Sequence, residues 1–193
     1  MAKTLDLVRD SASLIFVAVL LVACSDDRAP AEAAVAAPAT EPVKSTCSKG
    51  SFLRASLSGA LTADVDWPDA ALRCESMRRP DDRGVRLRLS GEVRGERLAF
   101  IIALPDLGAG ETGTGFDSVV TITVEGSARF FSTPSLGACW ADIEINRPLA
   151  EPGGSHVVAG TLDCVGPLGE FNGEAYVDLR DLQFSGVGDW NAT

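Results

Sequence analysis

The chain has 193 residues and a formal net charge of −10, from 17 Lys and Arg against 27 Asp and Glu. So acidic a composition argues against nucleic-acid binding, because phosphate contacts need clustered Lys and Arg. It suits cationic partners or divalent metal ions instead.

Residues 1–23 predict an export signal peptide. A short charged segment precedes the apolar run 14–20, which is too short to span a bilayer. The run leads into Leu21-Val22-Ala23-Cys24, which resembles the lipobox of bacterial lipoproteins. In that family the cysteine is lipidated and the chain is cut before it, so the resemblance implies a membrane anchor at Cys24. Ser25, where an aspartate would imply the inner membrane, implies the outer membrane, facing the periplasm. The alternative is an ordinary secretory signal.

Residues 24–46 predict the lipid anchor followed by a disordered linker. The segment is rich in Ala and Pro and has no aromatic residue. Prolines at 30, 38 and 42 break any alanine helix. A flexible coil of about 22 residues would hold the next domain roughly 25 Å from its anchor.

Four further cysteines predict two disulfides, as expected for an even number in an exported domain. They are Cys47, Cys74, Cys139 and Cys164. Three connectivities are open, and we favour Cys47–Cys74 with Cys139–Cys164 because each closes a loop of about 25 residues. A zinc site is the rival interpretation, but the sequence has no Cys-x-x-Cys pair and only one histidine.

Residues 47–193 predict a single β domain of ordinary size. Apolar and polar residues alternate over 53–58, 85–90, 120–125 and 141–146, as in half-buried strands. The run 98–104 is apolar on both faces and predicts a central strand. Asn172-Gly173 is typical of a type I′ hairpin, and 68–72 predicts one short helical turn. We predict an all-β, disulfide-stabilised antiparallel β-sandwich, with a small β-barrel as the alternative.

Two motifs suggest chemistry without the context that the chemistry requires. Residues 108–113 match G-x-G-x-x-G, but a strand pattern follows where dinucleotide binding needs a helix. His156 lies in a turn, and the sequence has no nucleophile elbow to pair with it. We therefore expect an inter-strand loop at 108–113, no catalytic residue and no cofactor.

Acidic residues at 64–69 are the candidates for a metal site. Asp64 and Asp66 lie two apart, so on a strand they face the same way, and Asp69 follows closely. Calcium needs six to eight oxygen ligands in loops. The alternative is a row of solvated carboxylates opposite the inward Ala63, Val65 and Trp67.

Aromatic residues at 130–131 and 140 are the candidates for ligand binding. Phe130 and Phe131 are adjacent, so on a strand they point to opposite faces. Trp140 is out of phase with the inward Ala141 and Ile143. An exposed aromatic pair can anchor a ligand, whereas the alternative has Trp140 packing over a disulfide at Cys139.

These features favour a lipid-anchored, non-enzymatic envelope module that binds an envelope protein or a glycan. One alternative is a periplasmic inhibitor of a cationic enzyme such as lysozyme, because the negative charge would steer association. Another is a metal-assisted hydrolase that uses the aspartate clusters. Sequence segments such as 74–81 and 129–133 resemble segments of uncharacterised exported proteins of Gram-negative bacteria. This resemblance implies no activity.

Overall fold

The computed structural model describes residues 47–77, 83–150 and 154–191. The predicted signal peptide, the lipidation site Cys24 and the linker lie outside the described residues. The chain divides into two units, Met1–Glu41 and Pro42–Thr193, and the fold below belongs to the second. The described residues contain no helix that is long and apolar enough to cross a membrane.

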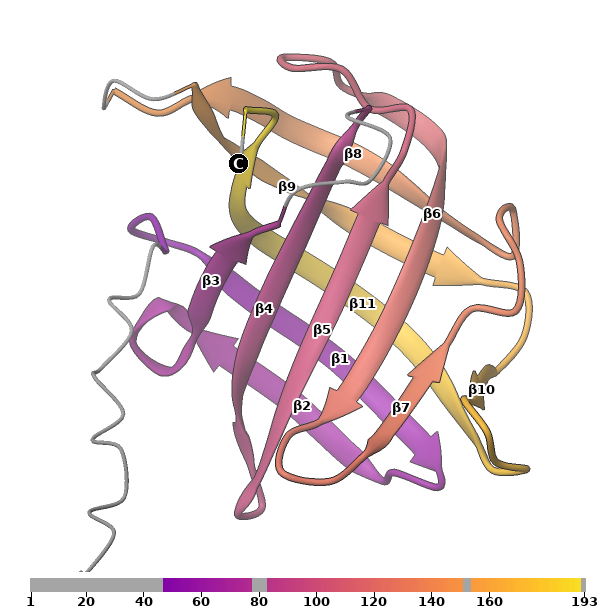
Figure 1. Ribbon diagram of the computed structural model, residues 1–193. Coiled ribbons are helices and arrows are strands. Elements are labelled where there is room, and N and C mark those ends of the chain that lie inside the picture. The colour runs from indigo at the N-terminus through magenta and orange to yellow at the C-terminus, as the bar shows by residue number, and fades with distance from the viewer. Residues whose placement is uncertain (1–46, 78–82, 151–153, 192–193) are drawn as a thin grey trace, which may run out of the picture. The chain divides into compact units, whose positions relative to one another are not determined.

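The described residues form eleven strands and one short 3₁₀ helix (Figure 1). In chain order these are β1 (Phe52–Gly59), β2 (Ala63–Pro68), η1 (Asp69–Ala71), β3 (Arg73–Ser76), β4 (Val85–Val93), β5 (Glu96–Leu104), β6 (Gly113–Val124), β7 (Arg129–Ser132), β8 (Cys139–Pro148), β9 (Ser155–Cys164), β10 (Leu168–Glu170) and β11 (Tyr176–Asp189).

The strands lie in two layers, and every pairing is antiparallel. One layer contains β3, β4, β5, β6 and β7, and the other contains β2, β1, β11, β9 and β8 (Figure 1). The layers join where β6 pairs with β8 and where β10 lies between β7 and β11. At the other side the edges are β2 and β3, which do not pair with each other in the described parts of the chain. The predicted antiparallel β-sandwich is therefore confirmed.

The core lies between the layers because each strand turns its apolar residues inward. On β2, for example, Val65 and Trp67 are buried while Asp66 is exposed. Trp67 meets Phe100 of the opposite layer edge to face, with ring centroids 5.7 Å apart. β5 is buried on both faces along most of its length, as the sequence predicted for a central strand.

Two local predictions were wrong. Ile145 was expected to face inward, but it is 41% exposed while Asn146 is buried, because the β8–β9 register shifts between Ile143 and Ile145. Such a bulge inverts the alternation beyond it. The second concerns the type I′ turn predicted at Asn172-Gly173. Asn172 has a φ of 57°, but Gly173 is not in the left-handed region. A type I′ turn needs positive φ at both positions, so the β10–β11 turn is of another kind.

The predicted disulfide pairing and the predicted helical turn are confirmed. Cys47 is bonded to Cys74 on β3, and Cys139 on β8 is bonded to Cys164 on β9. The separations are 27 and 25 residues, so each bond should stabilise the fold by about 3 kcal/mol in the chain-entropy model. The short turn expected at 68–72 is η1.

Candidate functional site

A cavity of about 400 Å³ opens at the outer surface beside β11. It lies beside the segment that connects β9 to β10. β9 pairs with β11 at Leu162↔Leu182, and β10 rejoins β11 at Leu168↔Val177. The lining consists of Asp163, Cys164, Val165, Gly166, Asp178, Leu179, Arg180 and Asp181. We call this the acidic cavity.

A bulge in β11 shapes one wall of the acidic cavity. The β1–β11 register shifts between Arg54↔Gln183 and Ser56↔Arg180, so β11 has an extra residue there. As a result Arg180 and Asp181 are both exposed, although neighbouring strand residues normally face opposite sides. Asp181 takes a φ of 54°, a conformation that Asp tolerates better than most residues.

The residues that line the cavity carry a net negative charge. Asp163, Asp178 and Asp181 line it, and Arg180 is the one basic residue in the lining. Within residues 47–77, 83–150 and 154–191, none of the three carboxylates lies within ion-pair distance of a basic group. The lining is polar, so the cavity suits a charged group better than an apolar ligand.

Aromatic side chains lie on both sides of the acidic cavity. Trp140 of β8 is directly opposite Asp163 on β9 and Asp117 on β6, so these three side chains share the outer face. On β11, Tyr176 is 54% exposed and lies two residues before Asp178, on the same face. An aromatic ring beside carboxylates can contact a cation through its π face.

The predicted aromatic candidates separate in the structure. Phe131 is fully buried and so cannot meet a ligand, whereas Phe130 on the opposite face is half-buried. Phe130 stacks on Phe171, which is 60% exposed, with centroids 5.1 Å apart. Trp140 is half-buried and lies next to the fully buried Cys139 on β8, so the two side chains point to opposite faces of the strand.

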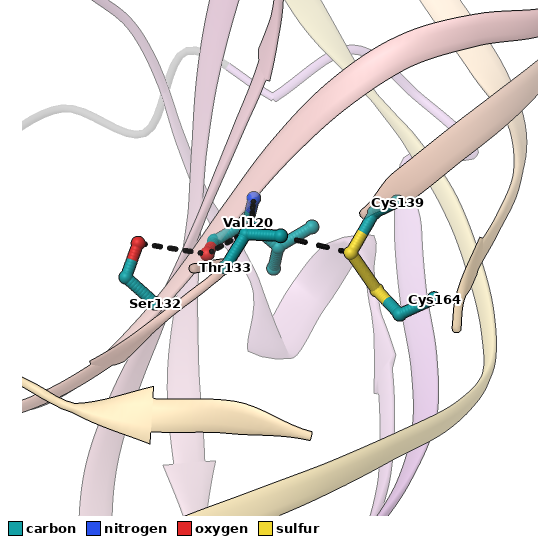
Figure 2. The surroundings of a disulfide bond; sticks show 5 residues. All are labelled: Val120, Ser132, Thr133, Cys139 and Cys164. Atoms are coloured by element: carbon teal, nitrogen blue, oxygen red, sulfur yellow. Dashed lines mark hydrogen bonds between the residues drawn. A yellow bond between two sulfur atoms is a disulfide. The ribbon is translucent and has the colours of Figure 1, made fainter. Parts of the chain in front are cut away.

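The Cys139–Cys164 disulfide holds the wall of the acidic cavity in place. Cys164 lines the cavity, and Cys139 is fully buried. Figure 2 shows the disulfide that joins them. Cys139 Sγ lies 4.0 Å from Thr133 Oγ1, which accepts a hydrogen bond of 2.7 Å from the Val120 amide (Figure 2). The disulfide thus lies beside the contact between the end of β7 and β6.

The predicted metal candidates do not converge on a site. Asp64 accepts a hydrogen bond from Ser56, Asp66 pairs with Arg54 at 3.1 Å, and Asp69 accepts the Gly50 amide. In the described part of the chain, no group of three or more His, Cys, Asp and Glu side chains is arranged to hold a metal ion. The three aspartates instead make separate contacts on the outer surface.

The glycine-rich loop and His156 are brought together by Asn146. The side-chain amide of Asn146 donates to the carbonyls of Gly108 and Glu111, each at 2.9 Å. Its oxygen therefore accepts from Nδ1 of His156, 3.0 Å away, which fixes the tautomer with hydrogen on Nδ1. Trp190 packs edge-on against the same ring at 5.1 Å. No hydroxyl or thiol among the described residues contacts the ring, so this network fastens the loop.

Sequence reasoning missed the acidic cavity. Asp163 and Asp178 are 15 residues apart in the chain and meet because β9 and β10 both pair with β11. A usable signal was present in β11: inward residues Val177 and Leu179 are followed by Leu182, which breaks the alternation. That phase slip indicates a bulge.

Comparison of the chain with known protein families, curated proteins and solved structures finds no significant match. The function is therefore argued from the cavity and its surroundings.

Proposed function

We propose that this protein is a non-enzymatic binding module of the bacterial envelope, whose acidic cavity receives a basic side chain of a protein partner. The observation that carries this proposal is the convergence of Asp163, Asp178 and Asp181 on one cavity without a neutralising ion pair among the described residues. The lipid on Cys24 and the linker would hold the module at the outer membrane, facing the periplasm.

The chemistry of the lining favours a lysine or arginine side chain as the ligand. A cation entering the cavity would gain attraction from the three carboxylates that line it. Trp140 and Tyr176 flank the carboxylates and can contact the aliphatic stem or the charge of such a side chain. Arg180 lies in the same lining and would favour a carboxylate or carbonyl beside the bound cation.

The charge of the whole chain supports a basic protein as the partner. A net charge of −10 would speed the encounter with a cationic protein and would make the association rate depend on salt. Inhibition of a cationic enzyme such as a lysozyme is one specific form of this function. No observation on the described residues favours the metal-assisted hydrolase.

The proposal is tested by the affinity of the purified full chain for a cationic lysozyme and for a short oligolysine peptide. Asn substitutions at Asp163, Asp178 and Asp181 should each weaken binding about threefold, and together about thirtyfold. Asp64→Asn is the matched control, because it removes the same charge from β2, outside the cavity. Equal losses in the control and in the cavity variants would reject the proposal.

A further inference from the structure

A second charged region lies on the outer face of the other layer, over β3, β4 and β5. Arg88 of β4 pairs with Glu75 at 3.0 Å and also with Glu125. Nε of Arg97 on β5 contacts Glu125 at 3.2 Å. The two terminal nitrogens of Arg97 are not part of this ion pair. Arg73 of β3 forms no ion pair with any described residue. Among the residues that the structure describes, the region therefore contains one guanidinium without an ion pair and one that is partly paired.

Arg73 and Arg97 line the same cavity, whose volume is about 330 Å³. Gly91 and Glu92 of β4 and residues 70–72 complete its lining. Gly91 is needed at this place, because a Cβ there would lie 2.6 Å from the ring of Trp67. The indole nitrogen of Trp67 in turn donates to the Glu92 carbonyl at 2.9 Å. The wall that separates the two arginines is thus rigid.

Ser90 adds a buried hydroxyl without a partner. The residue is 2% exposed, and its Oγ has no hydrogen bond with any residue that the structure describes. It lies directly opposite Arg73 across the β3–β4 pairing, so both side chains are on the same face of the sheet, and it precedes two residues of the cavity lining. An unsatisfied buried hydroxyl is destabilising, so its presence here calls for an explanation.

We propose that Arg73, Arg97 and Ser90 form a binding site for a protonated tetrahedral oxyanion, that is, phosphate or a phosphomonoester. Guanidinium groups bind phosphate oxygens through paired N–H donors, and the Ser90 hydroxyl would supply a further donor. Glu92 places a carboxylate in the same lining, which opposes a fully ionised anion. Inorganic phosphate near neutral pH and the singly ionised form of a phosphomonoester each retain an O–H that can donate to the Glu92 carboxylate, whereas sulfate has none.

The test is a titration of the ¹⁵N-labelled full chain with inorganic phosphate, followed by two-dimensional NMR at constant ionic strength. We expect saturable shifts of the Arg73, Ser90 and Gly91 amides with a Kd on the order of a millimolar. Arg73→Gln, a surface change that keeps the fold, should weaken binding at least about tenfold. Arg54→Gln is its control, because Arg54 lies on β1, is exposed and lines neither cavity.

Ser90→Ala separates a ligand-binding hydroxyl from a simple packing defect. We expect the variant to bind phosphate more weakly and to unfold at higher urea concentration, because a destabilising group is gone. Ser118→Ala removes another buried hydroxyl without a partner, on β6, and should leave phosphate affinity unchanged. If Ser90→Ala binds phosphate as the unaltered chain does, the hydroxyl has no part in the site and the proposal fails.

Glycerol 3-phosphate and sulfate complete the test. Binding of glycerol 3-phosphate alone, lost in Arg73→Gln, would support the site and point to a lipid headgroup phosphomonoester as its source. Binding of inorganic phosphate as well would point to the free anion. Shifts that chloride reproduces, equal affinity for sulfate, or unchanged binding by Arg73→Gln would each overturn the proposal.

Discussion

The two outer faces of the sandwich carry charge in different ways. Over β3, β4 and β5, long Glu and Arg side chains pair across strands, as Arg88 does with Glu75 and Glu125. Beside β11 the acids are aspartates, and Asp163 and Asp178 have no basic partner among the described residues. On the same layer Asp66 is paired with Arg54, so the difference lies at the cavity and not in aspartate as a residue type. Among the described residues, Glu75 and Glu125 over β3, β4 and β5 are thus paired, whereas the acids of the acidic cavity are not.

The largest combined effect on stability and binding is expected from removing the Cys139–Cys164 disulfide by Ala substitution at both positions. The free energy of unfolding should fall by about 3 kcal/mol, and affinity for oligolysine should fall because Cys164 lines the acidic cavity. Urea denaturation and binding are measured on the same sample. The Cys47–Cys74 pair is the control: it closes a loop of similar length, 27 against 25 residues, outside the cavity. Similar destabilisation with intact binding is expected there.

The free energies of unfolding of two variants, one without a paired carboxylate and one without a carboxylate of the acidic cavity, compare the two faces directly. Glu125→Gln leaves Arg88 and Arg97 without their shared partner, so unfolding should become easier by about 1–2 kcal/mol. Asp178→Asn removes no ion pair and should leave stability unchanged or slightly higher, since repulsion is relieved. Urea midpoints compare the two. Greater destabilisation by Asp178→Asn would contradict the described charge distribution.

A smaller effect, dependent on pH, is expected at Glu170. Its hydrogen bond with the Arg129 guanidinium, 2.6 Å long, lowers the pKa of the Glu170 carboxyl below its ordinary value of 4.5. The same contact raises the pKa of Arg129. Because the folded-state pKa of Glu170 is depressed, its stabilisation is complete above pH 4.5 and is lost as pH falls through the lowered value. Glu170→Gln should therefore be less stable than the unaltered chain near neutral pH, and the difference should shrink in acid. A difference that grows in acid would refute this assignment.

The smallest effect on stability is expected at Phe171. Its ring is 60% exposed, so Phe171→Ala should change the free energy of unfolding by about 0.5 kcal/mol or less. Phe131→Ala on the neighbouring strand should cost about 3–5 kcal/mol, because that side chain is fully buried. Thermal denaturation distinguishes the two. A large loss from Phe171→Ala would show that its stack with Phe130 is part of the core.

Much of the fold could be predicted from local patterns. Alternation of period two placed Leu87 and Leu89 inward, and the apolar run at 98–104 identified the central strand. Loop length alone favoured the disulfide pairing that the structure contains. These predictions succeed because each depends on neighbours along one strand or on the closure of one loop.

The acidic cavity could not be predicted in this way. The meeting of Asp163 with Asp178 depends on β9 and β10 sharing one neighbour, β11, which is a property of long-range register. The bulge at Ile145 is a further example, because no turn residue marks it in the sequence. His156 was considered apart from the glycine-rich loop, and the buried Asn146 side chain joins them by hydrogen bonds to both.

The central claim is that the acidic cavity is where this protein binds a cation. Titration of the ¹⁵N-labelled full chain with a short oligolysine peptide tests it most directly. We predict amide shifts concentrated at residues 163–166 and 178–181, with the amides of β3 and β4 unmoved. Shifts spread evenly over the acidic surface, or absent from these two segments, would contradict the account.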